Sequence, residues 1–187
     1  MSFKLKKNNK NLVKIFSIIE EKLPDSIFKK LGLSFFIYMT TNKIIHVYTI
    51  EKNNDISAII TVIDYKNYIS MNKKIIKYFI QHPLKILINF ISILGSTSKK
   101  SLIKINEDYL HLLHLIIIKK KFTDISIKRK DSILNNFYKK ILKKHSSKVL
   151  FLCFDEKNKK AQSYYKRNKF NFFYKIKNFI YLKKRYL

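Results

Sequence analysis

The chain has 187 residues, 47% of them hydrophobic, which is enough for one domain with a full core. Its 40 Lys and Arg residues and 12 Asp and Glu residues give a formal net charge of +28, a value typical of proteins that bind nucleic acid or anionic membranes. The Lys residues are scattered over the whole length, however, and the abundant Lys, Ile, Asn, Phe and Tyr have AT-rich codons. We therefore interpret most of the charge as a solvated surface shaped by genome base composition.

Cysteine content and hydropathy indicate the cellular compartment in which the chain would fold. Cys153 is the single cysteine, so no internal disulfide can form, which is consistent with a reducing cytoplasm. It lies in an apolar run and is expected to behave as a small hydrophobic residue rather than as a nucleophile. The N-terminus lacks the features of a cleaved signal peptide. The most membrane-like stretch, over 75–94, is interrupted by Lys77, Pro83 and Lys85, so we predict no transmembrane helix.

The first half of the chain is predicted to form two helices, a β-hairpin and a helical insertion. Leu12 begins an apolar stripe at helical spacing that Pro24 ends, and Asp25 or Ser26 can cap a second helix that Gly32 terminates. Two β-branched runs with a polar connection between them are typical of a hairpin. The predicted elements are helices over 12–23 and 26–31, strands over 43–50 and 56–64, and an insertion over 71–95 with helices at 71–80 and 83–94.

The second half is predicted to alternate strands and helices. The strand over 108–118 is mostly apolar in its second half, so we place it in the centre of the sheet. It contains His111 and His114, which differ by an odd number and should leave a regular strand on opposite faces, an argument against a shared metal site. The remaining predicted elements are a helix over 133–142, a strand over 149–154, a helix from 158, and strands over 170–174 and 178–182.

The stretch over 149–174 organises the C-terminal third of the chain. An unbroken apolar run at its start is suited to a buried strand and is too short for a helix. Asn158 can cap a short helix that carries Ala161 and Tyr165 on one face. An aromatic-rich run beginning at Phe170 then suits another strand.

This order of strand, Asn-led helix, Tyr and Phe-led strand resembles the C-terminal half of the GNAT (Gcn5-related) N-acetyltransferases. The family pattern runs Asn, two residues, Ala, two residues, Phe or Leu, Tyr, three residues, Gly, Phe. The chain matches it at Asn158, Ala161, Tyr164, Tyr165 and Phe170. Lys169 stands where the Gly ends the helix with a positive φ, a conformation that costs Lys about 1 kcal/mol. The segments over 23–32 and 108–122 also resemble the family's entry helix and central strand, so the likeness extends over nearly the whole chain.

The resemblance implies an α+β fold: a three-layer α/β/α sandwich around a mixed, mostly antiparallel twisted sheet, in a single domain over 1–187. It also implies an activity, the transfer of an acetyl group from acetyl-CoA to an amine of a small molecule, such as an amino sugar, or of a protein. In the family the deprotonated amine attacks the thioester directly, without a covalent intermediate. The acceptor site would be formed by the early helices and the insertion, which carry no diagnostic residues.

The phosphate-binding loop is where the sequence departs from the family. Family members open a helix with Gly-x-Gly, so that backbone N–H groups approach the coenzyme A pyrophosphate. The segment over 122–132 has no Gly. Either Lys128, Arg129 and Lys130 replace the backbone contacts by side-chain charge, with Ser126 or Ser132 near the turn, or the cofactor site has decayed. The cofactor-binding residues that the resemblance implies are Ile117, Ile118, Ser126, Lys128, Arg129, Lys130, Asn158, Ala161 and Tyr165.

The same resemblance implies two catalytic residues. Tyr165 would act as the general acid for the leaving thiolate, and the competing interpretation is an aromatic residue packed on the sheet. His111 occupies a strand position where related enzymes often place Glu, and an imidazole with a reference pKa near 6.5 can accept a proton directly or through water. Its competing interpretation is a strand histidine satisfied by hydrogen bonds. Glu107 and Asp108 are alternative bases, and Asn158 could be a simple helix cap.

Other kinds of site have less support. His46 and His145 have no Cys or His partner at metal-ligand spacing, so we predict no metal. The chain has neither a Walker loop nor a Gly-x-Ser-x-Gly elbow. Aromatic residues interleaved with Lys between Tyr164 and Tyr186 could bind single-stranded nucleic acid, which is the alternative function. A third alternative is a catalytically decayed protein that keeps the fold as a binding module.

Overall fold

The computed structural model describes residues 3–7, 11–24, 26–82 and 108–186. Seven strands among them form one sheet in the order β1-β2-β3-β4-β5-β7-β6. The β4–β5 pair is parallel and the other pairs are antiparallel. The strands are β1 (Lys4–Lys7), β2 (His46–Lys52), β3 (Asp55–Asp64), β4 (Tyr109–Ile117), β5 (Val149–Asp155), β6 (Asn171–Ile176) and β7 (Phe179–Arg185).

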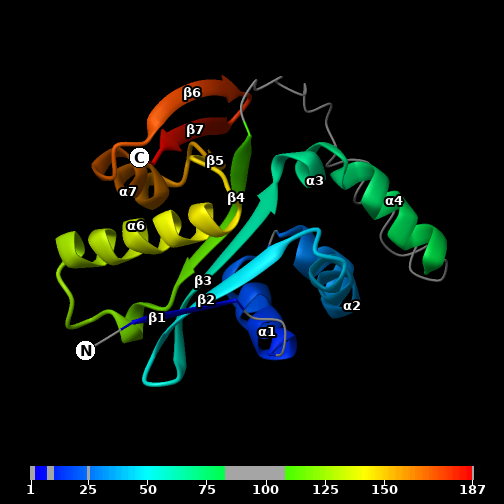
Figure 1. The fold of residues 1–187 in the computed structure, drawn as a ribbon, viewed down its shortest axis with the longest axis horizontal. Coiled ribbons are helices and arrows are strands. Elements are labelled where there is room, and N and C mark those ends of the chain that lie inside the picture. Colours follow the sequence, from blue (N-terminus) through cyan, green and yellow to red (C-terminus); the bar gives the residue numbers. More distant parts are fainter. Residues whose placement is uncertain (1–2, 8–10, 25, 83–107, 187) are drawn as a thin grey trace.

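Helices cover both faces of this sheet (Figure 1). One face carries α1 (Leu12–Lys22), α2 (Ile27–Thr41), α3 (Tyr65–Ile69) and α4 (Met71–Gln81), and the other carries α6 (Ile127–Lys144) and α7 (Lys159–Arg167). A short 3-10 turn, η2 (Lys119–Lys121), follows β4. The predicted α+β class, with three layers around a mixed and mostly antiparallel sheet, is therefore confirmed.

Strand β3 shows how the sequence builds a core on each face. Its residues alternate between the two layers, as a strand buried on both sides requires. Ile59 and Ile63 pack with α1 and α2, whereas Ile60 and Val62 pack with α6. All four side chains are fully buried, which explains why the run over 56–64 is almost continuously apolar.

The prediction for the N-terminal region was wrong in two respects. Gly32 does not end the second helix: it takes φ 80° and ψ 177°, kinks the chain, and helical structure continues to Thr41. Only glycine adopts such a backbone without strain, and beyond the kink Phe35 and Phe36 are fully buried against the sheet. Strand β1 was missed, because four residues of which three are Lys show no apolar period. The helix predicted over 83–94 lies outside the described residues.

A β-bulge in β4 overturns the prediction that His111 and His114 lie on opposite faces. Ile63 pairs with His111 and Thr61 pairs with His114, so Leu113 is an extra residue without a partner in β3. An extra residue reverses the alternation of side chains beyond it. Both histidines therefore lie on the α2 and α3 side of the sheet, where His111 stacks on Tyr68 and His114 contacts Phe28 edge-on.

None of the described helices combines the length with the apolar composition that a bilayer crossing requires.

The end of α7 confirms the strained position expected of Lys169. This residue takes φ 57°, and the backbone N–H of Phe170 then donates to the carbonyl oxygen of Tyr165 at 3.1 Å. The left-handed turn brings Phe170 back into the core beside Tyr165, with 5.1 Å between ring centroids. The chain thus keeps the turn that a glycine normally makes, at the expense of backbone strain.

We expect Lys169→Gly to raise the free energy of unfolding by about 1 kcal/mol, because glycine adopts a positive φ without strain. The matched control is Lys166→Gly, which removes the same side chain from the helical part of α7 and should lower stability by about 1 kcal/mol. Urea denaturation of the three proteins measures both values. Equal destabilisation by the two substitutions would contradict the account of this turn.

Candidate active site

The central feature of the site is the separation of β4 from β5. The two strands pair in parallel over only four residues each, from Tyr109 to Leu112 and from Val149 to Leu152. Both strands continue, β4 to Ile117 and β5 to Asp155, without further pairing between them. The edge of β4 that faces β5 therefore offers backbone N–H and C=O groups from Leu113 onward, which can pair with an extended ligand.

The bulge in β4 lies at the same point. Leu113, the extra residue, directly follows the last pair with β5. A bulge bends its strand and increases the local twist, which accounts for the divergence of β4 from its parallel neighbour. Ile117 and Ile118 lie at the far end of this free edge, and the Ile118 N–H donates to the carbonyl of Ser57 at 2.9 Å, so β3 fixes the other side of β4.

The N-terminus of α6 lies beyond the end of β4 and is suited to an anion. Ser126 is its N-cap, and the Ser126 hydroxyl accepts from the Arg129 N–H at 3.3 Å. Lys128 and Arg129 are exposed, whereas Lys130 is partly buried with its Nζ 5.6 Å from the ring centroid of Phe122. The first turn of α6 carries no acidic residue. The helix dipole, unpaired N–H groups and side-chain cations all favour negative charge here.

Helix α7 places Tyr165 against the part of β5 that has left β4. The Asn158 side chain caps the helix by accepting from the Ala161 N–H at 3.0 Å, which confirms Asn158 as a cap. Tyr165 is 8% exposed and its ring lies 5.5 Å from that of Phe154 in β5. Burial raises the pKa of Tyr165, and the nearby Tyr164 and Cys153 raise it further. The phenol therefore stays protonated at neutral pH.

His111 lies on the other face of the sheet among aromatic rings. It is 2% exposed and stacks on Tyr68 of α3, with 4.2 Å between ring centroids and 13° between the planes. Phe151 of β5 contacts the same imidazole at 5.4 Å. Burial raises the pKa of Tyr68, and Cys153 also contributes to that shift. Cys153 is the first β5 residue beyond the pairing with β4.

The sequence analysis did not single out His114 as part of the site. Its Nδ1 is buried and has no hydrogen-bond partner among the described residues, and the same holds for the hydroxyls of Thr61 and Ser57. Burial lowers the pKa of His114 to about 4, so its imidazole is neutral at pH 7. Buried polar atoms without partners are rare and invite a ligand or water. Only the bulge, which a single sequence does not reveal, brings His114 to the face of His111.

Asp108, the alternative base that the structure describes, is exposed, and its backbone carbonyl accepts from the Ser147 hydroxyl at 3.2 Å. Glu107 lies outside the described residues.

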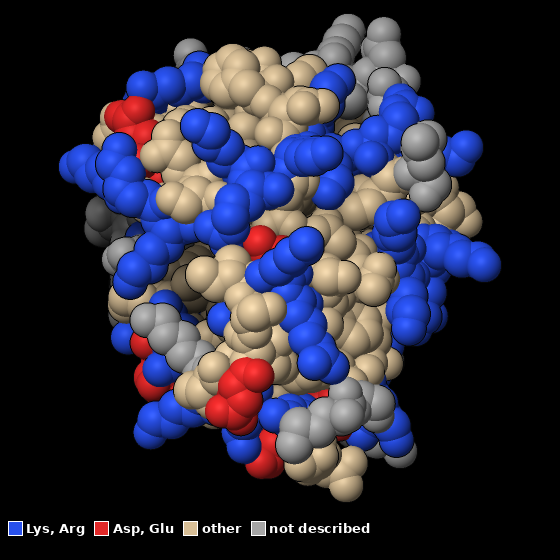
Figure 2. Space-filling view, turned by 90° about the vertical axis from the view of Figure 1, so that its left-hand side faces the viewer, with Lys and Arg blue, Asp and Glu red and all other residues tan. Residues whose placement is uncertain are grey.

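Basic side chains surround these features without forming one patch. Figure 2 shows Lys and Arg spread over the face of the molecule that carries α6, with few acidic groups between them. A groove of about 670 Å³ on β1 and the C-terminal part of α6 has five lysines in its lining, Lys4, Lys6, Lys140, Lys143 and Lys144. One of these lysines, Lys6, pairs with Glu51 at 2.6 Å. On the face drawn in Figure 2, Lys and Arg are scattered, as the sequence predicted.

Comparisons with known proteins agree with this geometry at the level of fold. No protein-family model and no curated protein matches the sequence. Among solved structures, PseH N-acetyltransferase of Campylobacter jejuni in complex with acetyl coenzyme A is 13% identical, with a TM-score of 0.57 over 98% of this chain and 99% of that one. PaiA N-acetyltransferase of Thermoplasma acidophilum, in complex with coenzyme A, is 16% identical, with a TM-score of 0.58 over 100% of both chains. NAA60 of Arabidopsis thaliana with acetyl-CoA is 15% identical, with a TM-score of 0.55 over 97% and 95%.

The chain therefore has the fold of the GNAT N-acetyltransferases, as its C-terminal pattern predicted. The likeness covers the whole length of these structures, so the helices and strands outside the C-terminal third belong to the same architecture. At these identities the likeness concerns the fold, and the residues of the site have to be argued from their own geometry.

Burial of His114 predicts a pH dependence of stability. Its folded-state pKa of about 4 lies below the unfolded value of about 6.5, so the unfolded chain binds the proton more readily and stability falls as the pH drops from 6.5 toward 4. We expect this one group to lower the free energy of unfolding by about 2 kcal/mol between pH 7 and pH 5.

Urea denaturation across this range, compared with His114→Phe, isolates the effect, since Phe keeps the ring beside Phe28. The variant should lose that part of the pH dependence, while its stability at pH 8 reports the change in packing alone. Parallel pH profiles for the two proteins would show that His114 is not the buried neutral group described here.

Proposed function

We propose that the protein is a divergent GNAT acetyltransferase that transfers an acetyl group from acetyl-CoA to an amine of a small molecule, such as an amino sugar, or of a protein. The observation that carries this proposal is the divergence of β4 and β5 at the β4 bulge, with Tyr165 against the free part of β5. The similar structures include N-acetyltransferases in complex with acetyl coenzyme A or coenzyme A, which supports the same reaction class.

Cofactor binding would use two properties of the described residues. The free edge of β4 up to Ile117 and Ile118 offers backbone groups to an amide-containing chain, in the way that a sheet edge accepts another strand. Ser126, Lys128, Arg129 and Lys130 surround an anion-favouring helix N-terminus. Charge-assisted contacts are about twice as strong as neutral ones, so these side chains can compensate for the absent glycines. This favours charge replacement over decay of the site. Ala161, partly buried below the cap that Asn158 makes, would lie beside the bound cofactor.

Tyr165 would serve as the general acid. Its raised pKa keeps the proton on the phenol in the resting state, so it is available to donate a hydrogen bond when negative charge develops on the leaving sulfur. Proton transfer then completes thiolate departure. The ring of Tyr165, on α7, packs 5.5 Å from that of Phe154 in the part of β5 beyond its pairing with β4, which fits a group beside the gap between the strands.

His111 would accept the amine proton from the other face of the sheet, directly or through water. It lies in the last stretch of paired β4, two residues before the bulge, and its ring is held by Tyr68 and Phe151. His114, neutral and with an unpartnered Nδ1, adds a hydrogen-bond acceptor on the same face. An amine acceptor entering from the side of α2, α3 and α4 would meet both imidazoles.

Titration calorimetry with acetyl-CoA tests the cofactor site, with desulfo-coenzyme A and plain polyphosphate as controls for charge. We expect saturable binding of acetyl-CoA that polyphosphate does not reproduce. Replacing both Lys128 and Arg129 by Gln should weaken it at least tenfold, because each charge-assisted contact contributes about 1.5–3 kcal/mol.

The matched control is Lys29→Gln with Lys30→Gln. These exposed residues lie in the first turn of α2, one position further from the cap than Lys128 and Arg129, and the Ser26 hydroxyl accepts from the Lys29 N–H. Their replacement removes the same charge from the opposite face and should change affinity less than twofold. Equal losses in both double variants, or equal binding of polyphosphate, would favour the alternative of a nonspecific polyanion binder such as a nucleic-acid-binding protein. Absence of acetyl-CoA binding would favour a decayed GNAT fold.

Tyr165→Phe tests the chemistry, with an acceptor chosen by screening amino sugars, polyamines and peptide N-termini for thiol release. We expect kcat to fall about 10²-fold with little change in the KM for acetyl-CoA, since the hydroxyl acts in the transition state. Tyr164→Phe is the control, because its hydroxyl approaches Tyr138 in the α6 layer at 3.5 Å. A kcat unchanged in Tyr165→Phe would leave Tyr165 as a packed aromatic residue.

A further inference from the structure

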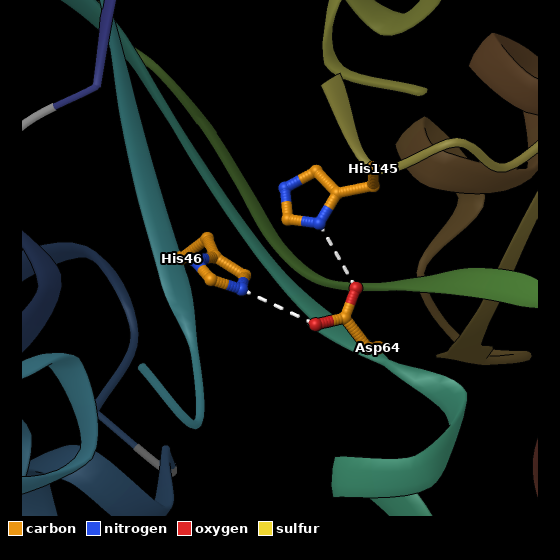
Figure 3. Close-up of side chains that lie close together, drawn as sticks. All are labelled: His46, Asp64 and His145. Atoms are coloured by element: carbon orange, nitrogen blue, oxygen red, sulfur yellow. Dashed lines mark hydrogen bonds and ion pairs between the residues drawn. The ribbon is translucent and has the colours of Figure 1, made fainter. Parts of the chain in front are cut away.

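Three side chains that are far apart in the sequence converge where β2 begins and β3 ends. His46 begins β2, Asp64 ends β3, and His145 follows the last turn of α6. Figure 3 shows both imidazoles directed at the two oxygens of the Asp64 carboxylate. His46 Nε2 lies 3.2 Å from Oδ2, and His145 Nδ1 lies 2.9 Å from Oδ1. One ligand atom from each residue fits within 4.8 Å of the other two.

A second layer of contacts orients the cluster. The Tyr48 hydroxyl lies 2.9 Å from His145 Nε2, which holds the opposite nitrogen, Nδ1, toward Asp64. Metal-binding histidines use this arrangement, in which the outer ring nitrogen donates to a fixed oxygen and the inner one keeps a lone pair for the ion. Burial, followed by the charge of Asp64, raises the pKa of Tyr48 to about 12, so the hydroxyl remains intact at neutral pH.

We propose that His46, Asp64 and His145 bind one divalent transition-metal ion, Zn²⁺ being the ion that this ligand set suits best. Two imidazoles and one carboxylate are typical zinc ligands, whereas Mg²⁺ and Ca²⁺ require more oxygens. Bonds of about 2.0–2.1 Å in a tetrahedron separate ligand atoms by about 3.3 Å. The present separations of 3.2 and 2.9 Å end on different oxygens of Asp64, and one ligand atom from each residue lies within 4.8 Å of the others, so binding one ion requires the three side chains to turn toward a common centre. The side chain of Asp64 is 38% exposed, which leaves the fourth position open to water.

The surrounding backbone also favours a cation. His145 is the C-cap of α6, and its N–H donates to the carbonyls of Ile141 and Leu142, so the negative pole of the helix dipole is directed at the cluster. The 18 residues of α6 span about 27 Å, which separates the cluster from the anion-favouring end at Ser126. Asp64 pairs with Leu110, the residue before His111, so the metal would lie beside the strand that carries the proposed base without being one of the proposed catalytic groups. It would join the start of β2, the end of β3 and the end of α6.

This hypothesis replaces the prediction of no metal that rested on sequence spacing. Spacing rules detect ligands on one turn, loop or helix, and these three residues lie on three separate elements. The inference is independent of the proposed acetyltransferase activity, because none of the three residues belongs to the candidate active site.

The test is calorimetric titration of Zn²⁺ into chelator-treated full-length protein, with Co²⁺ as a spectroscopic probe. We expect one Zn²⁺ per chain, a Tm that rises with Zn²⁺ concentration, and the visible absorption of four-coordinate Co²⁺ that excess Zn²⁺ abolishes. Asp64→Asn and His145→Gln should each weaken binding at least tenfold. His82→Gln, at an exposed histidine after α4, and Cys153→Ser are matched controls that should change affinity less than twofold.

Tyr48→Phe provides a test that still works if the ligand variants fail to fold. It leaves all three ligands in place and should lower Zn²⁺ affinity about 10-fold, the effect of losing an outer hydrogen bond. Circular dichroism checks the fold of each protein. Absence of saturable Zn²⁺ binding, binding that is lost in His82→Gln or Cys153→Ser instead, or a Co²⁺ spectrum without four-coordinate bands would each overturn the proposal and leave an ordinary His-Asp-His hydrogen-bond cluster.

Discussion

The structure depends on the limited parallel pairing between β4 and β5. Strands β1 to β4 form one antiparallel unit and β5, β7 and β6 form another, and these units share only the pairs from Tyr109 to Leu112 with Val149 to Leu152. Four residue pairs would not hold two half-sheets at a fixed angle without other contacts. Helix α6 supplies them, because Phe137 and Ile141 belong to the same buried cluster as residues of both strands. The gap is therefore a stable feature between two units held together by one helix.

Each half-sheet fixes its own strand at the gap. β4 pairs with β3 from Leu110 to Ile117 apart from the extra residue Leu113, and β5 pairs with β7 along its whole length, so both strands are held on the side away from the gap. The bulge at Leu113 adds twist to β4 at the point where β5 departs. A site formed in this way is preorganised, which is what a catalyst that aligns two substrates requires.

Much of the fold could be predicted from the sequence because hydrophobic periodicity and helix capping are local properties. The hairpin strand β3, the cap at Asn158 and the left-handed turn at Lys169 all depend on a few neighbouring residues, and each was predicted. Gly32 was misjudged since a positive φ can either end a helix or kink it, and the burial of later residues decides between the two. The sequence could not show the shared face of His111 and His114, because the bulge depends on how β4 pairs with β3.

The parts of the candidate site divide in the same way, into residues that local sequence indicates and residues that only the fold brings together. Tyr165 and the cations near Ser126 could be proposed from the sequence because they lie within recognisable local patterns. The Nδ1 of His114, which has no partner among the described residues, and the meeting of His46 with His145 are visible only in the folded chain. Residues that meet only in the folded chain have no characteristic spacing in the sequence, and a single sequence offers no second signal. Local chemistry could suggest a reaction class, but not the full set of groups that line the site.

Helix α6 also suggests how a chain of net charge +28 could accommodate both the proposed anion site and the proposed cation site. The two lie at opposite poles of one helix dipole, the first at the Ser126 cap and the second at the His145 cap. At the first pole the dipole and the side-chain cations act together, and at the second the carboxylate of Asp64 and the last carbonyls of the helix offset the surrounding lysines. Because the same helix holds the two half-sheets in place, a metal ion at its C-terminal end would fix the helix against β2 and β3, and through it the geometry of the gap.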